Sequence, residues 1–171
     1  SNGQLLRSNF GFANTERINP DGSVVQTINT SGIYLEGHAQ TGDGRLWFLN
    51  GYFGSPMQLY STTLGSSSIS LSYTGGTRPT PNSLSAYGNQ LAAIDYGGDG
   101  GRLLYSFTTF GSGIQSTSSV VIGGTSHLGT GTAIGHGNVV YGMTTGGGQA
   151  FLHRWIPGNS FTSTVNLTNT T

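Results

Sequence analysis

Few residues in this sequence could perform chemistry, and the closely spaced aspartates come first. Asp95 and Asp99 lie in DYGGDGG, and Asp43 lies in the similar stretch TGDGR. Carboxylates in glycine-rich loops can bind calcium through side-chain and backbone oxygens. The calcium-loop pattern of alternating acids followed by a distal glutamate is absent. Asp95 and Asp99 are therefore weak calcium candidates, and Asp-Gly turns are the alternative interpretation.

Four histidines are the other candidates for metal or acid-base chemistry. His38 and His136 occupy comparable stretches, EGHAQ and IGHGN, whereas His127 and His153 do not. A zinc site needs a defined ligand spacing, which these residues lack. Polar side chains facing a channel are the favoured interpretation, so we expect no metal and no cofactor.

Nucleophilic catalysis finds no support in the residue types. The sequence has no cysteine and no lysine, which excludes a thiolate nucleophile and a Schiff base. No GxSxG elbow and no recognisable Ser-His-Asp arrangement occurs. We therefore expect a protein that is not an enzyme. We also expect no pocket that gathers acids or histidines of shifted pKa.

Two kinds of residue could take part in glycan chemistry. Aromatic rings beside turns could stack on sugars, with packing between sheets as the alternative; these are Tyr52, Tyr73, Tyr87 and Tyr96. Asn-x-Ser/Thr triplets are acceptors for glycosylation in a secreted protein; they begin at Asn29, Asn166 and Asn169.

Glycine clusters recur along the chain, at 75–76, 97–101, 123–124 and 146–148. A phosphate-binding loop would need a helix directly after the glycines, and no helical pattern follows any of these clusters. Glycine adopts positive φ without steric cost, as tight hairpins require. The clusters therefore predict hairpin turns.

Composition limits the class of partner. Six arginines balance six acids in 171 residues, and charged residues make up only 7%. This balance gives no field that would attract nucleic acid. No apolar run approaches the roughly 20 residues of a membrane helix, so we expect no membrane insertion. The chain starts at Ser1 without a methionine and carries three Asn-x-Ser/Thr triplets, so we expect a secreted, extracellular or virion-surface setting.

Short apolar runs recur in a fixed order, which predicts an all-β fold. Similar runs occupy 4–10, 45–53, 90–96 and 138–145, with starts 41, 45 and 48 residues apart. Each of these four runs is followed by two further runs. In the second, third and fourth units another run also precedes it. A period of 41 to 48 residues with three or four strands is typical of β-propeller blades. The prediction is one domain over 1–171, with blades at about 1–30, 31–74, 80–123 and 127–171. A β-sandwich or jelly roll is the alternative.

The runs NVVYGMTTGGGQAFLHRWIPGN and QLAAIDYGGDGGRLLYSFTTFGSG are the clearest copies of the unit. Each copy has an apolar run, a Gly-rich turn, a run that contains aromatic residues, and a strand rich in Ser and Thr. This order resembles the kelch and related extracellular propeller repeats. The resemblance implies the propeller architecture alone. The tryptophan that kelch units place late in the blade has no counterpart, because Trp47 and Trp155 lie in other strands.

The first unit lacks one strand, because the chain enters it directly at QLLRSNF. An unpaired sheet edge invites pairing with another chain. We therefore expect a structural protein that associates with copies of itself through blade edges, as a fibre, sheath or coat subunit. A lectin-like or receptor-binding propeller that recognises glycans is the alternative.

Overall fold

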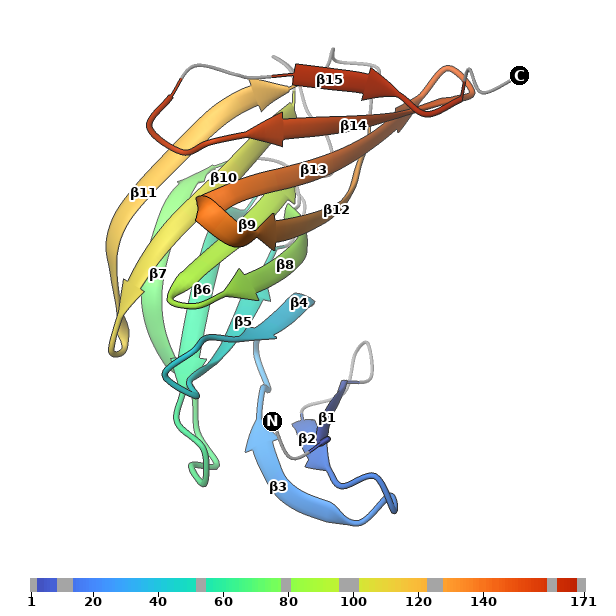
Figure 1. Cartoon of the computed structure of the whole chain (residues 1–171). Coiled ribbons are helices and arrows are strands. Elements are labelled where there is room, and N and C mark those ends of the chain that lie inside the picture. The colour runs from blue at the N-terminus through green and yellow to red at the C-terminus, as the bar shows by residue number, and fades with distance from the viewer. Residues whose placement is uncertain are drawn as a thin grey trace.

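The chain folds into four small antiparallel sheets in a computed structural model (Figure 1), which describes residues 3–8, 14–51, 55–77, 81–95, 102–122, 128–159 and 163–168. The first sheet contains β1 (Leu5–Ser8), β2 (Asn14–Ile18) and β3 (Val24–Asn29). The second contains β4 (Leu35–Gln40), β5 (Leu46–Asn50), β6 (Pro56–Thr62) and β7 (Ser70–Thr77).

The third sheet contains β8 (Pro81–Tyr87), β9 (Gln90–Asp95), β10 (Arg102–Phe110) and β11 (Gly113–Ile122). The fourth contains β12 (Leu128–Gly135), β13 (Val139–Gly146), β14 (Gln149–Trp155) and β15 (Ser163–Asn166), with a single turn of 3-10 helix, η1 (His136–Asn138), before β13. The described part of the chain contains no helix with the length and apolar character of a membrane span.

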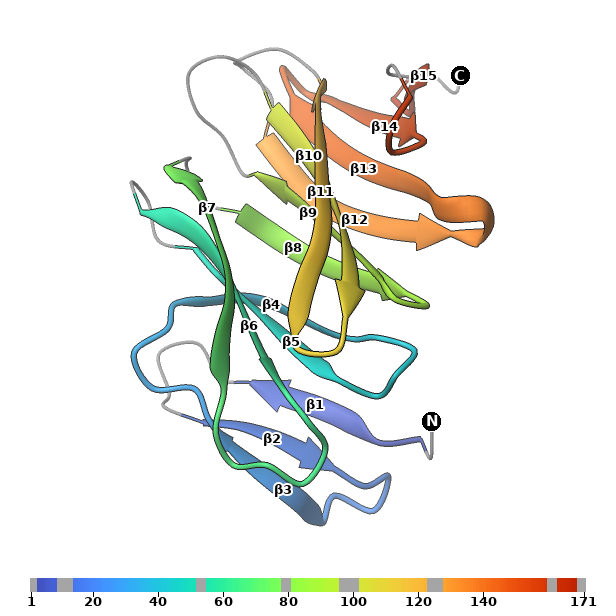
Figure 2. The ribbon, with the colours of Figure 1, turned by 90° about the vertical axis from the view of Figure 1, so that its left-hand side faces the viewer.

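Strands within each sheet follow chain order, and every pairing is antiparallel. The first sheet has three strands, in the order β1-β2-β3, and the other three have four. Figures 1 and 2 show the sheets following one another in a row, with the first and fourth at opposite ends. The fold is therefore all-β and propeller-like, and the four described sheets form an open row.

Apolar clusters lie between successive sheets because alternate residues of a strand point to opposite faces. Trp47, Leu49 and Leu59 of the second sheet pack with Leu91 and Phe107 of the third. Ala92, Ile94, Leu104 and Ile122 of the third pack with Val140 and Trp155 of the fourth. Ile28 of the first sheet packs with Leu46 and Phe48 of the second, with Leu6 beside them.

The glycine predictions have mixed outcomes. Gly147 and Gly148 have φ of 59° and 77° and form the tight turn between β13 and β14, as predicted. Gly75 does not lie in a turn but within β7, where a Cβ would come within 3.2 Å of the Tyr73 ring. The turn prediction for 75–76 was therefore wrong. The clusters at 97–101 and 123–124 lie outside the described residues.

The fourth repeat is offset by one residue from the alignment that the sequence suggested. Leu46 and Leu91, which follow the starts of their runs at 45 and 90, face the preceding sheet. In the fourth sheet Val140 faces the preceding sheet, so the equivalent run starts at 139 rather than 138. Because one residue of register exchanges the two faces of a strand, Tyr141 and Met143 face outward from the row.

Candidate functional site

The weak calcium candidates do not form a metal site among the described residues. Asp95 ends β9, is 2% exposed, and its Oδ1 accepts a hydrogen bond from the Leu103 backbone N–H at 2.9 Å. Asp99 lies outside the described residues. Asp43 accepts hydrogen bonds from the Thr41 hydroxyl and the Arg45 N–H within its own loop. The described side chains include no cluster of three or more potential metal ligands.

The histidines are spread over separate positions. His153 is buried on β14, and its two ring nitrogens lie 2.8 Å from Thr144 Oγ1 and 3.0 Å from Thr164 Oγ1. His38 lies on β4, whereas His127 and the side chain of His136 lie outside the description. His153 is thus held by hydroxyls of neighbouring strands, a structural role.

The glycan candidates fall in different environments. Tyr73 packs between sheets, its ring edge-on to Phe107 at a centroid distance of 5.3 Å. Tyr87 is 47% exposed beside the β8–β9 turn and lines a cavity of about 380 Å³ with Gln40 and Thr41. Tyr52 and Tyr96 lie outside the described residues.

Both described sequon asparagines end a strand. Asn29 is exposed at the end of β3, and its Oδ1 accepts a hydrogen bond from the Ser31 N–H at 2.9 Å. Asn166 ends β15 and accepts from the Thr168 N–H in the same way, also at 2.9 Å. Asn169 lies outside the described residues. Each described side chain is therefore engaged in a local turn within its own triplet.

One pocket gathers two titratable groups, against the expectation from the sequence. Glu36 and His38 line a cavity of about 380 Å³ together with Ser8, Ser83 and Leu84. Burial raises the pKa of Glu36 above 4.5 and lowers the pKa of His38 below 6.5. The expectation of no such pocket was wrong, because β4 carries both groups into the region where the first three sheets meet.

This pocket lacks the geometry of a nucleophile activated by a base. Ser83 Oγ lies 3.2 Å from Thr132 Oγ1 and accepts a hydrogen bond from the Thr132 N–H at 3.1 Å. Its hydroxyl is thus committed to the fourth sheet. Burial without a charged partner explains both pKa shifts. Glu36 and His38 therefore only line the cavity.

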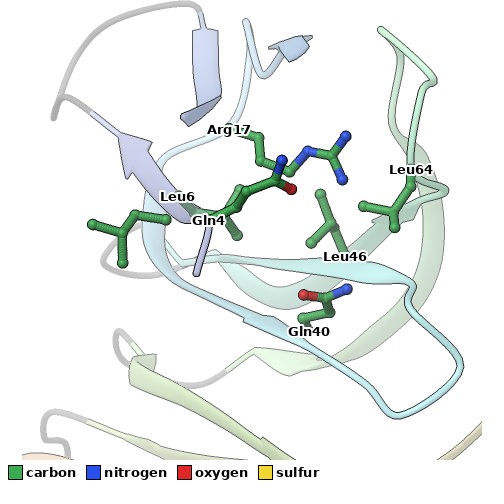
Figure 3. Close-up of a pocket in the computed structure, with 7 residues that line it drawn as sticks. Gln4, Leu6, Arg17, Gln40, Leu46 and Leu64 are labelled. Atoms are coloured by element: carbon green, nitrogen blue, oxygen red, sulfur yellow. The ribbon is translucent and has the colours of Figure 1, made fainter. Parts of the chain in front are cut away.

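A second cavity, of about 180 Å³, lies between the first and second sheets (Figure 3). Its walls are formed by Gln4, Leu5, Leu6, Arg17, Gln40, Leu46 and Leu64. The Arg17 side chain reaches across the cavity toward Leu64 (Figure 3). Its Nε is buried and has no hydrogen-bond partner in the described structure.

Sequence reasoning did not find Arg17, although the repeats carry the signal. The equivalent strands read Leu-Tyr-Ser at 59–61 and 104–106, Leu-His-Arg at 152–154 and Thr-Glu-Arg at 15–17. Ser61 and Ser106, at the position of Arg17, are 2% and 4% exposed between sheets. An arginine thus occupies a position where the second and third sheets bury a small hydroxyl.

The outer face of the fourth sheet carries a group of apolar residues, with Arg154 opposite Tyr141 on the same face. We define it by Tyr141, Met143, Leu152 and Val165, which neighbour one another across β13, β14 and β15. Met143 is 38% and Val165 54% exposed. The equivalent residues of the third sheet are Ala92, Ile94, Leu104 and Val120, which pack against the fourth sheet.

Comparison with known proteins supports the fold. No protein-family model and no curated protein matches the sequence. The structure is similar to a protein of unknown function from Bacteroides caccae, with a TM-score of 0.62 and 12% identity, covering 96% of this chain and 58% of that one. It is also similar to a prolyl endopeptidase structure, with a TM-score of 0.55 and 13% identity, covering 97% of this chain and 26% of that one. The chain thus spans less than two thirds of the length of either structure.

Proposed function

We propose that this chain is a non-enzymatic structural and interaction protein that associates with copies of itself. The outer face of the fourth sheet carries the proposal. Its four apolar residues occupy the positions at which the third sheet is covered by the next sheet. Covering such a face removes apolar surface from water, which contributes about 25 cal/mol per Å².

We assign the partner surface to the outer face of the first sheet of a second copy. Leu5, Ile18 and Val24 form a row across β1, β2 and β3, and Leu5 is 63% exposed. Leu5 occupies the position at which Leu91 and Val140 pack against a preceding sheet. Head-to-tail contact would therefore repeat, between copies, the stacking found within one chain. The open edge of β1, which pairs only with β2 among the described strands, lies at the same end.

The same stacking supports four propeller blades, because each described sheet is an up-and-down meander that packs face to face on the next. We also retain the extracellular setting as a proposal. Expression through a secretory pathway, followed by enzymatic removal of N-linked glycans, should give a mass loss that disappears when Asn29, Asn166 and Asn169 are all replaced by Gln.

Sedimentation velocity over a range of protein concentrations tests self-association. The wild-type mass is expected to rise with concentration, and Val165→Asp to remain monomeric. Val121→Asp is the matched control, because Val121 is 56% exposed on β11, away from the outer face of the fourth sheet. A wild type that stays monomeric at every concentration would refute the proposal.

Mixing two variants tests the head-to-tail arrangement. Leu5→Asp blocks the first-sheet face and Val165→Asp blocks the fourth-sheet face, so each alone should be monomeric. Their mixture should form a one-to-one complex through the two intact faces. If Leu5→Asp alone still dimerises, the fourth sheets pair with each other and the assignment of the first sheet is wrong.

Recognition of glycans is the second candidate function. It is favoured by Tyr87, whose exposed ring borders a cavity that also presents the exposed side chain of Gln40. Binding of a glycan on an array, lost in Tyr87→Ala, would support it.

A further inference from the structure

We propose that the cavity around Arg17 is a binding site for a small hydroxylated carboxylate, of which a uronic acid is the model. Leu5, which the proposed head-to-tail contact uses, also lines this cavity, so the site is tested on the monomer. The site lies between the first two sheets, and its cationic group belongs to β2 (Figure 3).

The charge of Arg17 is the first argument. The guanidinium forms no ion pair and no hydrogen bond among the described residues, and its Nε is buried. Arg7, by contrast, pairs with Glu16 on the opposite face of the first sheet. A half-buried cation without a counter-ion lowers stability. A carboxylate in the cavity would supply that counter-ion, and planar guanidinium groups bind carboxylates through paired hydrogen bonds.

The amides that line the cavity supply the second argument. Gln4 Nε2 donates to Asn19 Oδ1 at 2.8 Å, and Gln40 Nε2 donates to the Gly44 carbonyl at 3.2 Å. These bonds fix both amides and leave their Oε1 atoms as acceptors without partners among the described residues. Acceptor oxygens in the same cavity as a cation suit a ligand that carries hydroxyl donors as well as a negative charge.

Size and apolar walls supply the third argument. The volume of about 180 Å³ is below the roughly 300–1,000 Å³ of sites for drug-sized ligands. One sugar-sized ring is therefore the appropriate scale. Leu6, Leu46 and Leu64 provide surfaces for its C–H faces.

Calorimetric or NMR titration of the full chain, below the concentration at which it self-associates, tests the site. D-glucuronate is expected to bind, and neutral D-glucose to bind roughly tenfold or more weakly, because it lacks the charge-assisted hydrogen bonds to Arg17. Acetate should also bind more weakly, since it has no hydroxyl groups. Equal affinity for glucuronate and glucose, or no binding of glucuronate, would overturn the proposal.

Two variants separate the roles of the lining residues. Arg17→Gln is expected to weaken glucuronate binding roughly 10- to 100-fold. Gln4→Leu should weaken it several-fold while leaving the charge in place. Arg154→Gln, at the equivalent position of the fourth sheet, is the matched control and should bind as the wild type does. If Arg17→Gln binds glucuronate as tightly as the wild type, Arg17 does not bind the carboxylate and the proposal is wrong. Unchanged thermal stability in the same variant would show that water satisfies the guanidinium.

Discussion

The second sheet has two covered faces, and they differ in chemistry. Toward the third sheet it presents Trp47, Leu49 and Leu59, all fully buried in an apolar interface. Toward the first sheet it meets Arg17 and Gln26, and a cavity remains between Arg17 and the second sheet's Leu46 and Leu64. The same stacking geometry thus supports a filled interface and a polar interface with a cavity.

Polar contacts compensate in part for the smaller apolar cluster at the first interface. Gln26 Nε2 donates to the Ser66 carbonyl at 2.6 Å, and the Asn29 N–H donates to the Ser67 carbonyl at 2.8 Å. Both bonds join β3 to the turn between β6 and β7. The first sheet is therefore attached by hydrogen bonds to a turn as well as by burial.

Truncating equivalent residues on the two interfaces should give the largest difference. Trp47→Ala removes a buried ring whose Nε1 donates to Thr41 Oγ1 at 3.0 Å, and should lower the free energy of unfolding by about 3–5 kcal/mol. Leu6→Ala, at the same position of the first sheet, should lower it by about 1 kcal/mol because Leu6 is only half-buried. Urea denaturation measures both values. Equal losses would show that the two interfaces contribute alike.

Backbone approach at the filled interface predicts an intermediate effect. A Cβ on Gly37 would lie 2.8 Å from the backbone nitrogen of Leu84 in the third sheet. Gly37→Ala should therefore lower the free energy of unfolding by about 1–3 kcal/mol through overpacking. Gly131→Ala is the strand control, because its Cβ would meet no atom within 4 Å. The explanation fails if both variants lose the same stability in thermal denaturation.

Replacing the cation at the polar interface should have a smaller effect and the opposite sign. Arg17→Met retains most of the side-chain volume and removes an unpaired charge, so it should raise the free energy of unfolding by up to about 1 kcal/mol. Denaturation in urea without added carboxylate measures the change. A clear loss of stability would mean that the guanidinium is well satisfied in the empty site.

The smallest expected effect is the pH dependence of stability caused by Glu36 and His38, in the cavity where the first three sheets meet. Burial lowers the pKa of His38, so the unfolded chain takes up the proton first, and stability should fall as pH drops below 6.5. Glu36 has the opposite sign, since its pKa is raised and stability falls as pH rises above 4.5. In His38→Gln, the midpoint temperature of thermal unfolding should fall less between pH 7 and pH 5 than it does in the wild type. An unchanged profile would assign that slope to other groups.

Much of the all-β order could be predicted from the sequence, because turn residues and apolar runs are local signals. The register of the fourth repeat was missed because Asn138 was aligned with Gln90. Aligning the dipeptides Gly88-Asn89 and Gly137-Asn138, both of which precede a strand, gives the register of the structure. That single residue decides whether Met143 faces the third sheet or the outside.

The candidate sites were harder to predict. Arg17 in NTERIN has the ordinary appearance of an alternating strand, and only comparison with Ser61 and Ser106 marks it as unusual. The cavities themselves depend on how closely neighbouring sheets approach. Sequence patterns fix which face a residue occupies but not the gap between faces, so Glu36 and His38 were not expected to share a pocket.

The chain-order arrangement of the strands has a consequence for synthesis. Because every described strand pairs within its own sheet, a sheet can complete its hydrogen bonds before the next one leaves the ribosome. During that interval its forward face, such as Trp47 and Leu49, is open to water and to neighbouring nascent chains. Slow translation between sheets would therefore lengthen the period in which the chain is prone to aggregation.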